Sequence, residues 1–463
     1  MFLPKFKHWR VSLFAFSVAL AFALTPSSAS AQTVTGTLQG TVYDSGGAVV
    51  PGAEIVVTNL ETGQERTLRT NNEGAYVATY LPIGRYSVKA SGQGFTAATQ
   101  ESLEVTLNQT RVADFTLTPV GVTESVLVTS DATPINTTNA EIKGSLNRQE
   151  IQDKPVANQG SFLNLAETFS GFQENPVSGQ NNPTTSSGSS INFNGTGTRG
   201  ATFQINGVNN DDSSENQHRQ GVSLATIKEF QVITNNFSAE FGRGYGAVVL
   251  VQTLSGTNDI HGSGYWFNQN SRLNATNNVF APGSIKPVNR RNQFGFTTGF
   301  PVLKNRLFGF VSLDHVEDTG GGVLNRDVFL RSEHDPANWF RQTPQFDTAA
   351  NRAFIQSVLD RFAENEIFPN DPQRCARCFR GVQNRDFPLR DYSGRFDWNP
   401  NQNDQVTGRW QYPRQIFNAD DLIIGERADQ NNKQQNIGMT WTHLFSASTV
   451  GEFRYGLGLR TTL

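Results

Sequence analysis

One segment of the chain reads Tyr392-Ser393-Gly394-Arg395-Phe396-Asp397-Trp398, and a second reads Gln405-Val406-Thr407-Gly408-Arg409-Trp410-Gln411-Tyr412. In both segments, apolar or small residues alternate with polar ones, which is the period of a β-strand with two different faces. Residues 294–300, 307–313, 437–445 and 451–459 behave similarly. Aromatic residues near the segment ends are typical of strands that face lipid, although a soluble antiparallel sheet gives the same alternation. We favour a membrane barrel, because the pattern recurs through residues 256–463.

The composition agrees with many short strands joined by polar turns. The chain contains 34 phenylalanine, 6 tryptophan and 9 tyrosine residues beside 42 glycines, and only 17% of its residues are charged. Aromatic residues favour strands, and glycine favours turns. The net charge of -3 excludes a strongly basic surface for nucleic acid.

The N-terminus has the three parts of an export signal. Basic residues within positions 1–10 precede an uncharged run over residues 11–24, and the small-x-small triplet Ala29-Ser30-Ala31 follows. This order predicts a secretory signal peptide over residues 1–31, cleaved after Ala31. The alternative, a transmembrane anchor, needs about 20 apolar residues, more than this run offers. No later run is long enough for a membrane helix, so a membrane-inserted mature chain would cross as strands.

Residues 36–119 have the pattern of a separate small domain. Six apolar clusters are separated by turn residues rich in Gly, Asn, Asp and Pro. Short strands at this spacing indicate a β-sandwich.

Several motifs of this domain resemble the carboxypeptidase regulatory-like domain. They are Gly40-Thr41-Val42-Tyr43-Asp44, Pro51-Gly52-Ala53, Thr70-Asn71-Asn72-Glu73-Gly74-Ala75-Tyr76 and Leu81-Pro82-Ile83-Gly84-Arg85-Tyr86-Ser87-Val88. The resemblance implies a seven-stranded, carbohydrate-binding-like sandwich without peptidase chemistry. Its aromatic residues offer faces on which a sugar can stack, but strand aromatics more often belong to the core, and we favour the core. They are Tyr76, Tyr80, Tyr86 and Phe95.

Residues 135–255 have a mixed pattern. Residues 147–151 and 161–168 have helical patterning, and a helical turn is expected at 224–228. Strands are expected at 190–194, 201–205, 229–234 and 246–253. Between them, residues 171–190 form a loop rich in Asn, Ser, Gly and Pro.

This middle region resembles the plug of TonB-dependent receptors. The matching motifs are Thr198-Arg199-Gly200-Ala201-Thr202-Phe203-Gln204-Ile205-Asn206-Gly207-Val208, Ile227-Lys228-Glu229-Phe230-Gln231-Val232-Ile233 and Ala239-Glu240-Phe241-Gly242-Arg243-Gly244. Leu254-Ser255-Gly256-Thr257-Asn258 and the residues to Ser263 are similar to the plug-to-barrel junction of the Oar-like branch, and Asn292-Gln293-Phe294-Gly295-Phe296 to an early barrel strand. The resemblance implies a mainly β fold with an N-terminal β-sandwich, a mixed α/β plug domain and the first strands of an incomplete antiparallel transmembrane β-barrel. We count about eight strand candidates, whereas a plugged barrel needs about 22, so we expect an N-terminal fragment.

The resemblance also implies a TonB box before the plug, within the linker at residues 120–134. Glu124, Ser125, Val126, Leu127, Val128 and Thr129 occupy that position and are β-prone enough to add to a partner's sheet edge. A linker strand packed on the plug explains the same segment equally well. The implied partners are a TonB-type inner-membrane energy-coupling protein, outer-membrane lipid and a small or oligomeric solute, with carbohydrate as one option. No nucleic acid and no cofactor is implied.

One plug loop is expected to face the incoming solute, because its amides suit sugar or peptide groups. Its candidate residues are Arg199, Asn206, Asn209, Asn210 and Asp211. The acidic part at 209–212 also resembles a calcium loop in composition, but its ligand spacing matches no known loop, and we expect a solvated loop.

The remaining motifs point away from an enzyme. Cys375 and Cys378 supply two of the four ligands of a structural zinc site, and export favours oxidation, so we predict a disulfide that pins an exposed loop and no metal site. Residues 195–200 match G-x-G-x-x-G in letters, but a strand-like segment follows where a dinucleotide site needs a helix. The 6 histidines are scattered.

Together these observations predict an outer-membrane TonB-dependent transporter that takes up a bulky solute, such as a sugar, a peptide or a chelated metal. The alternative is an outer-membrane adhesion or carbohydrate-binding surface protein without transport.

Overall fold

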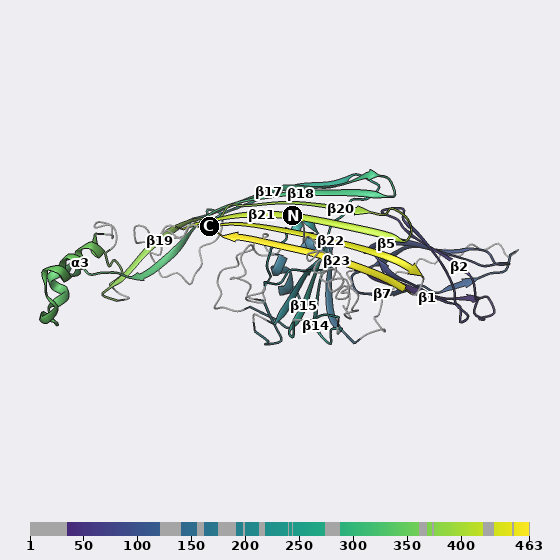
Figure 1. Cartoon of the computed structure of the whole chain (residues 1–463), viewed down its shortest axis with the longest axis horizontal. Coiled ribbons are helices and arrows are strands. Elements are labelled where there is room, and N and C mark those ends of the chain that lie inside the picture. The colour runs from purple at the N-terminus through teal and green to yellow at the C-terminus, as the bar shows by residue number, and fades with distance from the viewer. Residues whose placement is uncertain are drawn as a thin grey trace, which may run out of the picture.

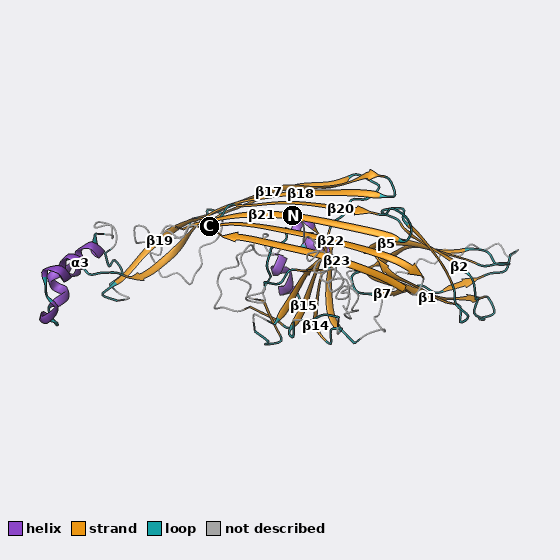
Figure 2. Cartoon of the chain, in the orientation of Figure 1, coloured by secondary structure: helices purple, strands orange, loops and turns teal. Residues whose placement is uncertain are grey.

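The computed structural model describes residues 35–120, 140–154, 162–174, 191–197, 200–212, 218–238, 240–242, 244–273, 288–360, 368–372, 375–419, 430–446 and 449–462. A long curved sheet arches over a central domain, with a smaller β domain at one end and helix α3 at the other (Figure 1). Figure 2 shows that strands dominate all three parts. The predicted signal peptide, the TonB-box segment and Arg199 lie outside the described residues.

The N-terminal domain is a sandwich of two four-stranded sheets. One sheet has the order β4-β1-β7, with β8 also on β1, and the other has the order β3-β2-β5-β6. β7 and β8 both run parallel to β1, so together they form one interrupted strand. The strands are β1 (Gly36–Asp44), β2 (Glu54–Asn59), β3 (Glu65–Arg69), β4 (Ala75–Leu81), β5 (Gly84–Ser91), β6 (Ala98–Val105), β7 (Thr110–Val112) and β8 (Phe115–Leu117).

The core of the sandwich contains two of the four aromatic residues for which sugar stacking was the alternative to core packing. Tyr76 and Tyr86 are buried, and their hydroxyl groups donate to the carbonyl oxygens of Ala113 and Pro82 at 2.6 and 2.7 Å. The expectation that these two residues belong to the core is confirmed.

The central domain, the plug, is built on a five-stranded sheet with the order β13-β12-β15-β14-β9. Residues 195–200, which match G-x-G-x-x-G, are followed directly by strand β12 and not by a helix, as predicted. The elements are β9 (Ile142–Asn147), α2 (Arg148–Asp153), η1 (Phe162–Thr168), β10 (Phe172–Glu174), β11 (Ile191–Phe193), β12 (Ala201–Ile205), β13 (Val208–Asn209), η3 (Leu224–Thr226), β14 (Ile227–Asn235) and β15 (Ala247–Thr253).

The plug sheet is buried on both faces. Every residue of β15 is buried, which explains why its sequence is an unbroken apolar run at its start and does not alternate. On one face, Phe230, Val232 and Val249 pack with Phe162 and Leu165 of η1. The other face carries Ile233, Val248 and Leu250, and the sandwich covers it.

The arched sheet has eight antiparallel strands with β16 and β23 at its edges. The first part of β18 pairs with β20 and its second part with β19, so β19 and β20 act as one barrel strand interrupted at Phe387 and Pro388. The predicted fold class is confirmed. The strands are β16 (His261–Asn270), β17 (Asn289–Leu303), β18 (Leu307–Asp327), β19 (Cys378–Asp386), β20 (Leu389–Trp398), β21 (Asp404–Ala419), β22 (Gln430–Ser446) and β23 (Thr449–Thr462).

The second part of β18 and β19 extend past the other strands and carry an arm that the sequence patterns did not predict. It contains η4 (Arg331–His334), η5 (Pro336–Phe340), η6 (Pro344–Phe346) and α3 (Ala349–Leu359). A disulfide joins Cys375 to Cys378, the first residue of β19, at the base of the arm. Cys378 is buried, so the bridge lies where the strand begins and not within a fully exposed loop. In the parts of the chain that the structure describes, no helix has the length and apolar character needed to cross a membrane.

Candidate functional site

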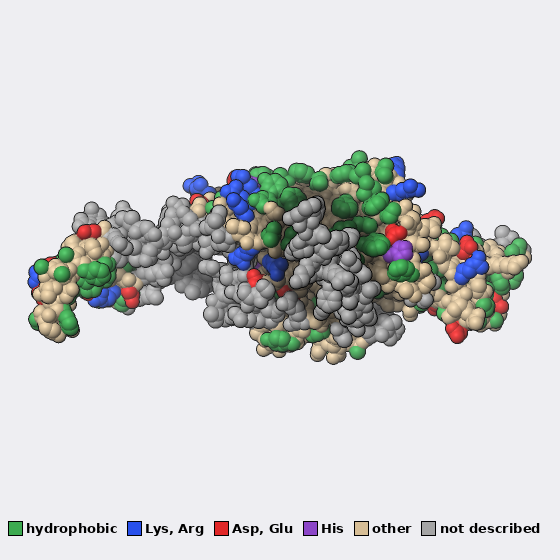
Figure 3. Space-filling view, in the orientation of Figure 1, with side chains coloured by type: hydrophobic (Ala, Val, Ile, Leu, Met, Phe, Trp, Pro, Cys, Tyr) green, Lys and Arg blue, Asp and Glu red, His purple; other side chains and the backbone are tan. Residues whose placement is uncertain are grey.

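The two faces of the arched sheet have opposite chemistry. The face toward the plug carries buried polar side chains: Gln293, Thr297, Ser312, Asp314, Asp391, Arg409, Gln411, Gln415, Asn432, Gln434 and Asn436. The outer face carries exposed large apolar side chains: Trp266, Phe294, Phe296, Tyr392, Phe396, Trp410, Met439, Trp441, Phe453, Tyr455 and Leu459. Figure 3 shows hydrophobic side chains gathered along the upper side of the molecule, over β17 and β18. A soluble sheet would have the reverse arrangement, because water favours polar side chains outside.

A turn of the plug is seated in the barrel wall. Asn206 and Gly207 both have positive φ, of 50° and 74°, as a two-residue turn between β12 and β13 requires. Val208, the next residue, lies over Gly438 and Gly456, which are cross-strand partners of β22 and β23. A Cβ on Gly456 would lie 2.5 Å from Cγ1 of Val208, so only glycine leaves room there. We call these two glycines the glycine socket.

A guanidinium holds the same turn in place. Nη1 of Arg454 donates to the carbonyl oxygen of Gly207 at 3.1 Å. Arg454 is itself held by Glu452 through an ion pair of 2.6 Å, and the Glu452 side chain is almost fully buried. The turn therefore meets an apolar socket and a fixed hydrogen-bond donor side by side.

A second group of polar contacts joins the barrel sheet to two parts of the plug, the segment that precedes β14 and the end of β15. Oγ of Ser223 donates to Asp314 of β18 at 2.6 Å. Nε2 of Gln411 donates to the carbonyl oxygen of Gly221 at 2.9 Å. Nη1 of Arg395 donates to the carbonyl oxygen of Thr253, at the end of β15, at 2.7 Å. Polar contacts of this kind can be exchanged for contacts with water.

The prediction of a solvated loop at residues 209–212 is wrong for Asn210 and Asp211, while Asn209 is exposed as expected. Asn210 and Asp211 have no exposed surface. The Asp211 carboxylate accepts hydrogen bonds from the backbone N–H of Phe203 at 2.6 Å and from the hydroxyl of Thr202 at 2.7 Å. These donors would otherwise be buried without an acceptor, which explains the acidic residue.

The residues predicted to face the solute are thus distributed over different environments. Asn206 is buried and bonds both the backbone N–H and the hydroxyl of Thr253, each at 2.8 Å. Asn210 donates to the carbonyl oxygen of Gln220 at 2.8 Å. Only Asn209 of this group is exposed among the residues that the structure describes. Contact with a solute stays a prediction, and for Asn206, Asn210 and Asp211 it requires a different arrangement of the plug.

Glu229 of β14 is a buried carboxyl group that the sequence patterns did not single out. Both its oxygens lie 3.1 Å from the backbone N–H of Leu107, in the turn between β6 and β7 of the sandwich. Burial raises the pKa of Glu229 from 4.5 to about 7, and the hydrogen bond from Leu107 opposes part of that rise. The sequence signal that could have indicated this buried carboxyl group is a glutamate within a strand of apolar neighbours.

The contact between Glu229 and the sandwich is expected to weaken as the pH rises from about 4.5 to 7. In this window the folded protein holds a proton that the unfolded chain has released, so stability falls with pH, by up to about 3 kcal/mol. Glu229→Gln should remove this dependence, because the neutral amide still offers an oxygen to Leu107. Hydrogen exchange of the peptides that contain Leu107 and β14, corrected for the intrinsic rate, measures the effect in the whole protein. Glu104→Gln, an exposed neighbour, is the control and should keep the dependence.

Three family models match successive parts of the chain. The carboxypeptidase regulatory-like domain matches residues 37–118, the TonB-dependent receptor plug domain matches residues 135–249, and the outer membrane beta barrel domain matches residues 252–461. Each match coincides with one of the three parts described above.

The chain is also similar to individual known proteins. The chain is 27% identical over 304 residues to the TonB-dependent transporter Oar of Myxococcus xanthus, and the match covers 63% of this chain and 28% of that protein. Among solved structures, the outer membrane transporter YddB from Escherichia coli is 11% identical with a TM-score of 0.43, covering 68% of this chain and 38% of that one. The siderophore receptor PirA from Pseudomonas aeruginosa is 14% identical with a TM-score of 0.40, covering 69% and 41%.

The chain therefore spans less than a third of the length of the curated relative. Because the regulatory-like, plug and barrel models follow one another along it from residue 37 to residue 461, the chain has the domain order of, and fits, an Oar-like TonB-dependent receptor.

Proposed function

We propose that this chain belongs to an energised outer-membrane transporter that takes up a bulky solute, such as a sugar, a peptide or a chelated metal. The observation that carries the proposal is the inverted chemistry of the arched sheet, whose apolar side chains point outward and whose polar side chains point to the plug. An apolar outer face with aromatic residues suits lipid, and a polar inner face suits a water-filled lumen. The predicted signal peptide at residues 1–31 would direct export.

The plug supports transport because it is held by contacts that can be exchanged. Its seat includes one valine in the glycine socket, hydrogen bonds from Arg454, Gln411 and Arg395, and the hydrogen bond from Ser223 to Asp314. A permanent wall would be joined to the barrel by a continuous apolar core or by strand pairing. We infer that the plug closes the lumen at rest and moves when force is applied.

The force has to come from another protein, because an outer-membrane protein has no nucleotide supply of its own and the sequence has no P-loop motif. A TonB-type energy-coupling protein of the inner membrane is the proposed partner, and residues 124–129 are its proposed contact. A β-prone segment can pair with the edge of a partner's sheet through main-chain hydrogen bonds.

Deletion of residues 124–129 is expected to lower solute uptake at least about tenfold, because the linker before the plug loses the segment that a partner would bind. The measurement compares cells that carry the complete native protein, the deletion variant or neither, using a panel of labelled sugars, peptides and iron chelates. A deletion of residues 130–135 shortens the linker by the same length and is the matched control. Full uptake by the first variant, with normal surface levels, would refute energised transport.

A surface-adhesion function is the second candidate, and the arm that carries α3 favours it. The arm extends away from the sandwich end of the molecule and exposes Phe346 and Phe354 (Figure 1). Adhesion needs no energy input, so cells with the 124–129 deletion would adhere as well as cells with the native protein.

A further inference from the structure

The sandwich completes the core of the plug. Ile83, from the turn between β4 and β5, and Leu107, from the turn between β6 and β7, form one buried cluster with Ile233, Val248 and Leu250 of the plug sheet and with Phe241. Leu107 has no exposed surface. Two separate turns of the sandwich thus reach into the face of the plug sheet that η1 leaves open.

Polar contacts surround this apolar contact. Gln231 of β14 donates to the carbonyl oxygen of Leu107 at 2.9 Å, next to the bond between Glu229 and the Leu107 N–H. Lys228 pairs with Glu61 of the sandwich at 2.8 Å and also donates to the carbonyl oxygen of Ile83 at 3.1 Å. Most of these hydrogen bonds are made to the backbone of the sandwich turns. Because they are directional, they fix the orientation of the sandwich relative to the plug.

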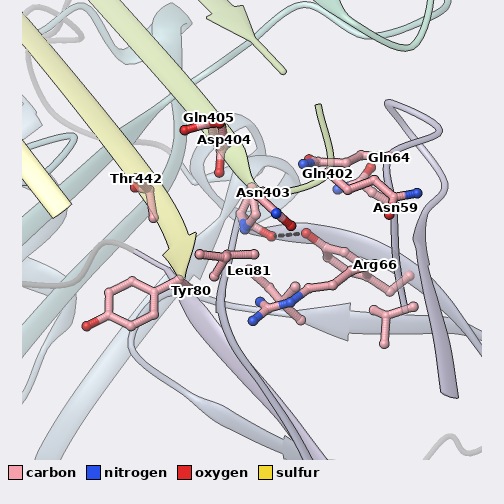
Figure 4. A pocket seen from close by; sticks show the side chains of 14 residues that line it. Asn59, Gln64, Arg66, Tyr80, Leu81, Gln402, Asn403, Asp404, Gln405 and Thr442 are labelled. Atoms are coloured by element: carbon pink, nitrogen blue, oxygen red, sulfur yellow. Dashed lines mark hydrogen bonds between the residues drawn. The ribbon is translucent and has the colours of Figure 1, made fainter. Parts of the chain in front are cut away.

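The sandwich also rests against the barrel. The backbone N–H of Asn258, in the segment between β15 and β16, donates to the carbonyl oxygen of Glu61 at 3.0 Å. A small cavity lies between the sandwich and the turn between β20 and β21. Arg66, Tyr80 and Leu81 line it on the sandwich side, and Asn403 and Asp404 line it on the barrel side (Figure 4). The sandwich therefore contacts the moving part and the fixed part of the proposed transporter.

Chain order places the proposed pulling point between these two domains. Residues 124–129 follow the last sandwich strand, β8, and precede β9, the first strand of the plug. Among the described strands, β9 is an edge strand that pairs with β14, the strand that carries the sandwich contacts. Lys143 of β9 also donates to the carbonyl oxygen of Asn108 at 2.6 Å, so β9 itself touches the sandwich. A pull on residues 124–129 loads the β9 pairing and the sandwich contacts together.

We propose that the sandwich is a lock on the plug, and that it must leave β14 before the plug strands can move. The inference rests on the proposed energised transport, and it assigns the N-terminal domain to the regulation of plug opening. A plug that moved first would expose Ile233, Val248 and Leu250 to water while the sandwich stayed attached to the barrel. Release of the sandwich first opens the contacts that are nearest to the pulled segment.

A covalent bond between sandwich and barrel tests the order of events. Glu61→Cys with Asn258→Cys places two thiols at positions whose backbones are hydrogen-bonded, which brings them within reach of a disulfide. Glu54→Cys with Arg69→Cys joins β2 to β3 inside the sandwich and is the control, since these residues are exposed cross-strand partners. The complete native protein is placed in a lipid bilayer, and single molecules are pulled through an azide-bearing residue at position 127.

With the first pair oxidised, the force that releases the plug should be at least about twofold higher than in the same variant with the pair reduced. The comparison is made within the variant, because Glu61→Cys removes the ion pair with Lys228. The control pair should leave the force unchanged. The lock is refuted if the plug is released at the same force with the 61–258 pair oxidised, or if the control pair raises the force equally. The measurement needs no solute, so it is independent of the uptake experiment: loss of energised transport would show there as unchanged uptake after the 124–129 deletion.

Discussion

Gly207→Val is expected to leave the barrel without a seated plug. Gly207 has a φ of 74°, a conformation that costs a β-branched residue about 2 kcal/mol or more. Its Cβ would also lie 2.6 Å from Nη1 of Arg454, which is held by Glu452 and cannot move away freely. Both effects push Val208 out of the glycine socket. Since each 1.4 kcal/mol changes an equilibrium tenfold, the unseated fraction should rise at least about tenfold.

Cells that produce the complete protein with Gly207→Val should admit a large antibiotic that the outer membrane normally excludes, and the purified protein should conduct ions in a planar bilayer. Gly242→Val is the matched control, because Gly242 is an exposed plug glycine with open space around its Cβ position. Normal exclusion by the Gly207→Val variant would show that the socket does not hold the plug.

Gly40→Ala is expected to destabilise the sandwich strongly. A Cβ at this position of β1 would overlap the carbonyl oxygen of Ala113, which belongs to the backbone between β7 and β8. That backbone is fixed, because the Ala113 N–H donates to Gln39 at 2.7 Å and its oxygen accepts from Tyr76 at 2.6 Å. Overpacking against backbone should cost about 3 kcal/mol or more, a large share of the roughly 4–12 kcal/mol that stabilises a domain of this size.

The measurement is hydrogen exchange of the peptides between residues 36 and 119 in the whole protein, and protection should fall about a hundredfold throughout, because each 1.4 kcal/mol changes the opening equilibrium tenfold. Gly94→Ala separates backbone strain from overlap, because Gly94 has a positive φ of 86° but open space around its Cβ position. Equal protection in both variants would mean that β1 can move away from Ala113. A sandwich unfolded by Gly40→Ala would also remove Leu107 from the plug core.

The period of the sequence was enough to predict six of the eight strands and the two faces of the barrel sheet, but not β16 and β19. Phe396 and Trp410 alternate with Asp397 and Arg409, and the structure places the aromatic residues outside and the polar ones inside. The period does not depend on contacts between domains, so it can be read from neighbouring residues alone. β19 was missed because its sequence, CFRGVQNRD, does not alternate cleanly.

The seat of the plug was not predictable in the same way. Gly438 and Gly456 are remote from Val208 in sequence, and a strand glycine gives no sign of which side chain approaches it. The solvated loop was predicted from its composition, but Asp211 is buried because Phe203 and Thr202 present donors to it. Partners of this kind depend on tertiary structure, which local patterns do not contain.

The strand order of the plug sheet, β13-β12-β15-β14-β9, has a mechanical consequence. The strand joined to the pulled linker, β9, is one edge of this sheet. The turn held by the glycine socket joins β12 to β13, at the opposite edge. On the proposed mechanism, a pull on the linker would separate β9 and then β14, while the parallel pair of β12 and β15 would stay in contact with the barrel wall. A passage created in this way would open on the β9 side of the plug only. The half that stays in contact with the wall would be in position to re-form the sheet when the tension ends.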